Sequence, residues 1–401
     1  MLKKIILFLF VISFLSSCHT ARFFKWNIVN QDDYKKFDYL KINKSDNPFL
    51  FIENTLSNNL KLPSKIQTKK GEILSFNDAL IKDKTIAFLI IKKDSILYEK
   101  YFYGFDKNSI QASFSMSKSF LSTLTAIAID EGQINSVNDP ITKYLDFLDK
   151  EKFKDITIEN LLDMRSGILS KKDFLNPFGQ IVKMYYGKNL KKYMQSLKVK
   201  TAPDTEYEYS NVNSQLLALI LQKATGKLVT EYLEEKIWKP LGMEQNAQWS
   251  IDSKKNKTIK AFCCMNASAR DYAKIGRLYL NNGKWNGKQI INKNWIDNVS
   301  TFKNTKNDFR YSYHWKHAVT YEVTDKNTVY PKLYVDGGYF LDQNNKRNDF
   351  IIYPYPAYFA VGIFGQFTYV YPEKDIIIVR LGKKDREIDW EELFKKIVEA
   401  N

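Results

Sequence analysis

The stretch Phe114-Ser115-Met116-Ser117-Lys118-Ser119-Phe120 decides how this chain is interpreted. The residues that follow it, up to Ile129, repeat apolar side chains in the pattern of a buried helix, which Gly132 can end. On such a helix Ser115 and Lys118 lie three residues apart and share one face. A serine hydroxyl becomes nucleophilic when a neighbouring base takes its proton, and a lysine with a lowered pKa can do so. The pair suggests covalent acyl transfer, and a helix cap is the alternative interpretation of Ser115.

A second Ser-x-x-Lys copy runs from Ser300 to Lys303. It leads into a polar stretch, so the sequence predicts a helix end and a loop there. The first copy instead follows Gln111-Ala112-Ser113, a loop that would deliver Ser115 to a helix N-terminus, where backbone N–H groups favour developing negative charge. Much later, the run Tyr209-Ser210-Asn211 offers a tyrosine that can share the proton relay.

The composition allows one large domain with an insertion, or two domains. The chain has 401 residues, 44% of them hydrophobic and 15% aromatic, which is ample for a packed core. The formal net charge is +16, but the lysines are spread along the whole chain and no nucleic-acid motif accompanies them. We therefore expect no nucleic-acid partner, and a lysine-rich surface that faces anionic envelope components.

Histidine content limits the possible chemistry. The sequence contains only His19, His314 and His317, and no Gly-x-Ser-x-Gly elbow. This disfavours a Ser-His-Asp triad. Two histidines at 314 and 317 also fall short of the clusters that hydrolytic zinc sites need. Lysine and tyrosine remain as bases, and we expect no metal and no organic cofactor.

The N-terminus has the features of an export signal. Lys3-Lys4 precede an apolar run over 5–14, which is too short for a convincing membrane span, so residues 1–17 are predicted to be a signal peptide. The next residues, Leu15-Ser16-Ser17-Cys18, resemble the bacterial lipobox. That resemblance implies that Cys18 is the lipid attachment site and that the exported protein is membrane-anchored at the bacterial cell envelope, facing the periplasm or the cell surface. The alternatives are an ordinary cleaved signal and an uncleaved anchor.

The other two cysteines, Cys263 and Cys264, are adjacent. Adjacent residues rarely form a disulfide because the geometry strains the backbone. We therefore expect no disulfide framework, and a role for both as small apolar filler beside Phe262.

Strand patterns occur near both ends of the chain, with helical patterns between them. Residues 18–80 are polar and weakly patterned and are predicted to form an extension. The β-rich runs 85–92 and 95–103 are separated by Lys93-Asp94, which is a hairpin signal. Helices are predicted from 156 to about 166, and over 216–221, 229–238, 269–280 and 385–400. Late strands are predicted over 350–353, 359–364, 367–371 and 375–381.

This order predicts an α/β (α+β) fold. One antiparallel sheet would be built from both chain ends and flanked by helices, with an inserted, mostly helical subdomain at about 136–330. The main domain would span 81–385, and the helix within 386–401 would pack on the sheet. A site would lie at the junction of the sheet and the subdomain.

Several motifs in this order resemble the serine β-lactamase and penicillin-binding-protein superfamily, in its class C-like branch of esterases, peptidases and amide hydrolases. The resemblance spans about 85–381. It is carried by the Ser115 motif, by Ile156-Thr-Ile-Glu-Asn-Leu-Leu-Asp-Met-Arg-Ser-Gly167, by Tyr209-Ser-Asn211 and by Pro240-Leu-Gly-Met243. Within the branch, three further features resemble enzymes of the 6-aminohexanoate-dimer hydrolase type; these are Trp249, the Cys263-Cys264 segment and the run 269–276.

The resemblance implies a role for each matching residue. Ser115 would be the acylated nucleophile and Lys118 the base that activates it. Tyr209 would relay the proton to the leaving group and later activate water. Asn211 would orient Lys118 or hold a substrate amide. The alternative for Tyr209-Ser-Asn is a turn after Pro203-Asp204.

The sequence departs from the family's third motif, commonly Lys-Thr-Gly or His-x-Gly. The aligned stretch is Gly362-Ile363-Phe364-Gly365-Gln366. Ile363 cannot supply a cation for a substrate carboxylate, a role that Arg310 or a lysine of the subdomain would have to take. Gly365 would let the strand approach the substrate, and the Gln366 N–H would complete an oxyanion hole with that of Ser115. The alternative for Gly362 and Gly365 is a strand bulge.

A second departure lies in the turn before the tyrosine motif. Asp204 stands where the family often has glycine, and aspartate tolerates turn geometry. Taken together, the resemblance implies a serine hydrolase that cleaves an amide or ester bond of a small-molecule or peptide-like substrate through an acyl-enzyme. The alternatives are a β-lactamase or D,D-peptidase acting on cell-wall-like substrates, and a non-catalytic envelope protein that binds or senses.

Overall fold

The structure is a computed structural model and describes residues 19–26, 29–54, 60–171, 173–301, 310–323 and 350–401. The predicted signal peptide and Cys18 lie outside these residues. Within the described ranges, none of the helices combines the length and the apolar character needed to cross a bilayer.

The main sheet has eight strands, in the order β12-β13-β14-β15-β16-β5-β6-β2. Neighbouring strands are antiparallel except for β2, which lies parallel to β6 at the edge. The predicted sheet built from both chain ends is therefore confirmed, with one parallel pairing added. The strands are β2 (Ile52–Glu53), β5 (Thr85–Lys92), β6 (Ser95–Tyr101), β12 (Tyr311–Ser312), β13 (Trp315–Val323), β14 (Phe350–Gly362), β15 (Gln366–Tyr371) and β16 (Ile376–Gly382).

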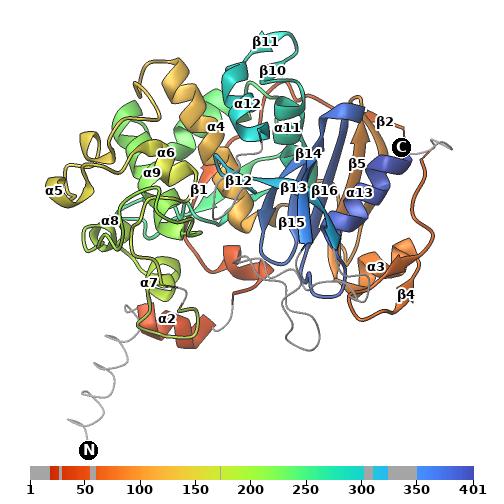
Figure 1. Ribbon diagram of the computed structural model, residues 1–401, viewed down its shortest axis with the longest axis horizontal. Coiled ribbons are helices and arrows are strands. Elements are labelled where there is room, and N and C mark those ends of the chain that lie inside the picture. Colours follow the sequence, from red (N-terminus) through yellow and green to blue (C-terminus); the bar gives the residue numbers. More distant parts are fainter. Residues whose placement is uncertain (1–18, 27–28, 55–59, 172, 302–309, 324–349) are drawn as a thin grey trace, which may run out of the picture.

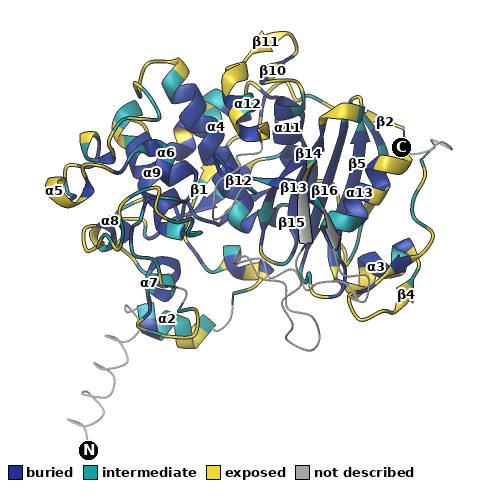
Figure 2. Ribbon diagram, viewed as in Figure 1, coloured by how far each residue is buried: buried dark blue, intermediate teal, exposed yellow. Residues whose placement is uncertain are grey.

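The centre of this sheet is covered on both faces, which explains why its strands are continuous apolar runs. On β5, Leu89 and Ile91 face the helical core, whereas Phe88 and Ile90 face the C-terminal helix α13 (Trp390–Ala400). Figure 1 shows α13 on one side of the sheet and the helices from the middle of the chain on the other. Strands β5, β15 and β16 at the centre of the sheet are buried along almost their whole length (Figure 2).

The predicted hairpin is present. Lys93 and Asp94 have φ of 49° and 61°, the left-handed pair that a two-residue turn between twisted strands requires. β5 and β6 pair antiparallel on either side of this turn.

The middle of the chain is mostly helical. Its helices are α4 (Ser117–Asp130), α5 (Lys150–Phe153), α6 (Ile158–Leu162), α7 (Gln180–Tyr186), α8 (Leu190–Met194), α9 (Asn211–Thr225), α10 (Val229–Leu233), α11 (Ala269–Leu280) and α12 (Lys293–Ser300). The helix predicted to begin at about 156 begins at Ile158 because Thr157 forms a capping box with Asn160. The pattern predicted to be helical over 229–238 is divided, since a π-helical turn, Glu234–Trp238, follows α10.

The N-terminal segment takes part in the main sheet and in a four-stranded sheet. After α2 (His19–Trp26), strand β1 (Tyr39–Ile42) pairs with β8 (Ala247–Ser250) in a second, four-stranded sheet, which also contains β9 (Met265–Ala267) and β7 (Gln111–Ala112). Strand β2 extends the main sheet. The extension is therefore hydrogen-bonded into the core, which its polar sequence did not indicate.

Candidate active site

Ser115 lies in a 3-10 turn, Phe114–Met116, that leads directly into α4. Phe114 has a φ of 45°, an unusual backbone conformation for a residue with a side chain. Its ring packs against that of Phe364, with centroids 5.3 Å apart, and this contact helps to hold the turn. Ser115 is partly exposed, whereas both of its neighbours are buried. The turn therefore presents the hydroxyl-bearing residue at the start of a buried helix.

Lys118 lies one turn further into α4 and is only 1% exposed. Its Nζ lies 3.0 Å from Ser115 Oγ, 3.1 Å from Asn211 Oδ1 and 2.7 Å from the carbonyl oxygen of Phe262. The structure thus brings together Ser115, Lys118 and Asn211 as the sequence predicted, and adds a backbone carbonyl that the sequence analysis missed.

These contacts fix the direction of proton transfer. Burial lowers the pKa of Lys118 to about 7, so the neutral amine is well populated near neutral pH. A neutral amine has two N–H donors and one lone pair. The carbonyl of Phe262 and the Oδ1 atom of Asn211 can only accept, and together they use both donors. The lone pair is left for the Ser115 hydroxyl, which is the arrangement of a general base.

Tyr209 lies against the same amine. The centroid of its ring is 4.9 Å from Lys118 Nζ, and the ring of Tyr311 packs on it at 5.9 Å in an edge-to-face geometry. Ser210 caps α9 by accepting from the N–H of Val212, which places Tyr209 just before the helix and Asn211 in its first turn. Capping thus explains why a tyrosine and an asparagine two residues apart both reach Lys118.

His314 supports the helix from behind the lysine. Its Nδ1 lies 3.2 Å from the carbonyl oxygen of Lys118, and its own carbonyl accepts from Ser119 Oγ at 2.8 Å. Burial, with the nearby Lys118, lowers the pKa of His314 to about 3, so the ring is neutral at physiological pH. His314 is a positioning residue for the first turn of α4.

The end of β14 reaches the turn that contains Ser115 at Gly362. A Cβ built on Gly362 would overlap the carbonyl oxygen of Ser113 and would lie 3.1 Å from the amide nitrogen of Ser115. Glycine is therefore required at 362 for the strand to approach this closely.

Gly365, which the sequence predicted would let the strand approach a substrate, faces Arg380, whereas Gly362 makes the close approach to the turn of Ser115. Gly365 has a φ of 73° and faces the buried guanidinium of Arg380, so its missing side chain makes room for that group. Gln366 is fully buried, and its Nε2 donates to the carbonyls of Ile363 and Gly382 at 3.0 and 2.8 Å. Ile363, which is 50% exposed, is the residue of this turn that faces solvent.

Ile363 is apolar, and Arg310, which was predicted as a possible replacement cation, has partners elsewhere. Its guanidinium donates to a carboxylate oxygen of Glu391 in α13 and to the carbonyl of His317.

Asp204 adopts the turn that the sequence predicted, with a φ of 61°. Its carboxylate accepts from Asn160 Nδ2 at 2.9 Å.

The second Ser-x-x-Lys copy ends a helix, as predicted. Ser300 is the last residue of α12, and its hydroxyl donates to the carbonyl of Asp297. Lys303 lies outside the described residues.

The adjacent cysteines form a disulfide, contrary to expectation. Cys264 has a φ of 73°, so the backbone turns sharply where the two side chains meet. The carbonyl that binds Lys118 belongs to Phe262, directly before this bridge. The adjacent cysteine pair is thus the feature of the sequence that could have drawn attention to the Phe262 carbonyl as an acceptor for Lys118.

The chain is similar to several known proteins. Residues 82–400 match the family model described as Beta-lactamase. The chain is 25% identical over 228 residues to the 6-aminohexanoate-dimer hydrolase of Paenarthrobacter ureafaciens, an alignment that covers 54% of this chain and 57% of that protein. It is 29% identical over 140 residues to the D-alanyl-D-alanine-carboxypeptidase/endopeptidase AmpH of Escherichia coli K12, covering 34% of this chain and 36% of that protein.

The alignments thus span less than two thirds of both curated relatives. Among solved structures, a putative 6-aminohexanoate-dimer hydrolase from Bacillus anthracis superposes with a TM-score of 0.70 at 21% identity, covering 90% of this chain and 89% of that chain. This likeness establishes the fold. Since the family model covers most of the chain, the protein belongs to the Beta-lactamase family.

Proposed function

We propose that this protein is a serine hydrolase that cleaves an amide or ester bond through an acyl-enzyme on Ser115. The observation that carries the proposal is the position of Lys118 Nζ, which lies 3.0 Å from Ser115 Oγ and has two acceptors, Asn211 Oδ1 and the carbonyl oxygen of Phe262, for the N–H groups of the neutral amine. In acylation, Ser115 Oγ bonds the substrate carbonyl carbon and Lys118 Nζ takes the hydroxyl proton. That proton passes to the leaving group by way of Tyr209, and the amide or ester bond breaks. In deacylation, Tyr209 activates a water that attacks the acyl carbon, the bond between this carbon and Ser115 Oγ breaks, and a proton from the water returns to Ser115 as the acid product leaves.

The developing oxyanion would be stabilised by backbone N–H groups. One is the N–H of Ser115 at the start of α4, where the helix dipole also favours negative charge. The second would be the N–H of Ile363, because the preceding residue, Gly362, lies against the Ser115 amide. In this proposal the Ile363 N–H takes the oxyanion-hole role that the sequence suggested for the Gln366 N–H.

The substrate class follows from the turn at 363. Ile363 offers an apolar surface where a cation would bind a carboxylate, so uncharged amides and esters fit best. The similarity to a 6-aminohexanoate-dimer hydrolase supports an amide substrate.

A fluorophosphonate probe tests the nucleophile. We expect it to label Ser115 covalently, and Ser115→Ala to abolish labelling with little change in the thermal midpoint, since one partly exposed oxygen is removed. Ser300→Ala is the matched control, because it removes the serine of the other Ser-x-x-Lys copy and should leave labelling intact. Labelling that survives in Ser115→Ala would assign the chemistry to another serine, and a folded protein that never labels would favour a binding or sensing role.

The second candidate function is a β-lactamase or D,D-peptidase. The similarity to the Escherichia coli carboxypeptidase/endopeptidase favours it. Kinetics on nitrocefin beside p-nitrophenyl acetate separate the two candidates. We expect weak or no turnover of nitrocefin; a much larger kcat/KM for nitrocefin would establish the second candidate.

We also propose that the protein is exported and lipid-anchored through Cys18, on the support of the Leu15-Ser16-Ser17-Cys18 motif. Mass spectrometry of the mature N-terminus is expected to find an acylated Cys18 as the first residue. An unmodified start beyond Cys18 would refute the anchor.

A further inference from the structure

One surface of the molecule concentrates exposed apolar side chains. Among the described residues, the three most exposed large apolar side chains are Leu175 (82%), Phe24 (72%) and Phe178 (68%). Phe174 (61%) directly precedes Leu175 in the sequence. Isolated apolar residues on a surface are common, but a group of the most exposed ones marks an interaction site.

The two segments that carry these residues meet at α7. Helix α2, which contains Phe24, packs along α7: Arg22 donates to the carbonyl of Tyr186 at 3.1 Å, and the rings of Phe23 and Tyr186 are 6.0 Å apart. The segment 173–178 leads into the other end of α7, where Asp173 accepts from the N–H of Gln180 at 3.0 Å. Since α7 has seven residues and is about 10 Å long, the two segments lie near each other in the fold.

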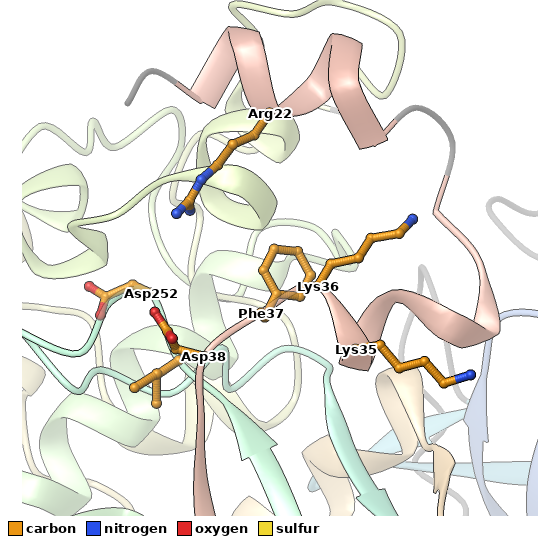
Figure 3. Close-up of a pocket in the computed structure, with 7 residues that line it drawn as sticks. Arg22, Lys35, Lys36, Phe37, Asp38 and Asp252 are labelled. Atoms are coloured by element: carbon orange, nitrogen blue, oxygen red, sulfur yellow. The ribbon is translucent and has the colours of Figure 1, made fainter. Parts of the chain in front are cut away.

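The inner face of α2 is fixed, so its outer face remains available. Figure 3 shows Arg22 reaching from α2 toward Asp38 and Asp252, in a cavity of about 190 Å³. Trp26 packs against the ring of Phe37 at 5.4 Å. With Arg22, Phe23 and Trp26 turned inward, Phe24 and Lys25 are the exposed residues of the helix.

Basic side chains accompany the apolar ones. Lys25 on α2 and Lys171, just before the loop, are exposed, and Lys183 on α7 is partly exposed. Aromatic and leucine side chains bordered by lysines are the composition of surfaces that lie in the headgroup region of an anionic bilayer.

We propose that this apolar-basic surface, formed by Phe24, Phe174, Leu175 and Phe178 with Lys25 and Lys171, docks on an anionic lipid bilayer. The course of the chain supports this occupant. Helix α2 begins at His19, directly after the apolar run 5–14 and Cys18, so an anchored N-terminus has no linker that would carry the surface away from the membrane. Anchor and surface together would hold the domain in one orientation on the bilayer, and the inference rests on the proposed Cys18 anchor but not on the proposed hydrolytic function.

The test uses the full chain reconstituted into phosphatidylcholine vesicles that contain phosphatidylglycerol. A nitrobenzoxadiazole label on Leu175→Cys reports insertion, and the unsubstituted chain gives the background from native cysteines. We expect several-fold brighter, blue-shifted emission on vesicles and strong quenching by spin-labelled lipid. The matched control is the label on Ile52→Cys, which is 62% exposed in β2 at the distant edge of the main sheet and should stay in water.

A second variant shows whether the surface acts as a unit. With the label kept at 175, Phe24→Ser/Phe178→Ser should reduce the emission and the quenching toward the values at 52. Equal signals at 175 and 52, or a signal at 175 that ignores the double substitution, would overturn the proposal. Because these side chains are exposed, the variants are expected to fold normally.

Discussion

Two buried lysines, Lys118 and Lys260, lie in similar surroundings and are suited to different tasks. Each is at most 1% exposed, donates to a backbone carbonyl and lies over an aromatic ring. Burial lowers the pKa of both. Lys260 contacts the carbonyl of Tyr185 and the ring of Phe37, whose centroid is 3.2 Å from its Nζ.

Of these two lysines, Lys118 is the one whose Nζ lies within hydrogen-bond distance of a hydroxyl on a partly exposed residue, Ser115. Lys260 instead lies at the contact between the N-terminal segment and the body, because Phe37 precedes β1 while Lys260 lies between β8 and β9. A lowered pKa therefore does not by itself identify a general base. A lysine is identified as a base by the acceptors that bind its N–H groups and by the group that lies opposite its lone pair.

The strongest challenge to this comparison is to replace each lysine with methionine, which is of similar length. Lys118→Met should lower kcat/KM for a short-chain ester by roughly two or more orders of magnitude, the scale of general-base loss. Lys260→Met should leave kcat/KM close to the wild-type value. Steady-state kinetics at pH 7 on both folded variants provide the measurement, and equal losses would refute the distinction.

An introduced third lysine sharpens the comparison, because it would be exposed and charged. Ile363→Lys should improve binding of carboxylate-bearing substrates by about ten- to a hundred-fold, the range for one charge-assisted hydrogen bond of about 1.5–3 kcal/mol. KM for nitrocefin and for p-nitrophenyl acetate should diverge in this variant. Parallel changes for the two substrates would show that residue 363 does not face the carboxylate.

The pH profile tests the charge state of Lys118. Since its pKa is lowered to about 7, kcat/KM should rise about tenfold per pH unit below that value and level off above it. Asn211→Asp places a carboxylate beside Nζ and raises the pKa, so the midpoint should move to higher pH and activity at pH 7 should fall by about fivefold for a shift of one unit. Lys260→Met is the control and should keep the wild-type midpoint.

The smallest expected effect is on stability. Burial lowers the pKa of Lys260 below its unfolded value of 10.5, so the unfolded chain binds the extra proton between these values and wild-type stability rises with pH there. Lys260→Met removes this dependence and the cost of the buried amine, and should raise Tm near pH 7 by about 2–4 °C. The gain should shrink toward pH 10.5 in calorimetric scans. A constant difference across pH would mean that the amine carries no burial cost.

Local patterns predicted a large part of the fold and of the site. Helix α11 has the predicted bounds, 269–280, because its apolar face repeats at helical spacing. The contact between Ser115 and Lys118 was predictable because the two residues are three positions apart at the start of one helix. Tyr209 and Asn211 were candidates because they flank a serine that caps a helix.

Other features depend on contacts between distant segments and have no local signal. The carbonyl of Phe262 is a backbone atom that any residue could supply, and only the fold brings it to Lys118. Gly362 and Gly365 look alike in sequence; what each one faces, Ser115 or Arg380, is decided by the register of β14 and β15. The strand patterns over 350–353 and 359–364 belong to one strand, β14, because both parts pair with β13.

The pairing of β5 with β16 has a consequence for the order of folding. Ile90 lies opposite Ile378, so the centre of the main sheet joins a strand made early in synthesis to one made near the end. Contacts between segments so distant in the chain close slowly, since the loop entropy is lost before the pairing is gained. A nascent chain that lacks β16 leaves β5, an almost wholly buried strand, with β6 as its neighbour on one side and without its partner on the other. The sheet, and the turn of Ser115 that rests against β14, can therefore mature only after the last strands have been synthesised.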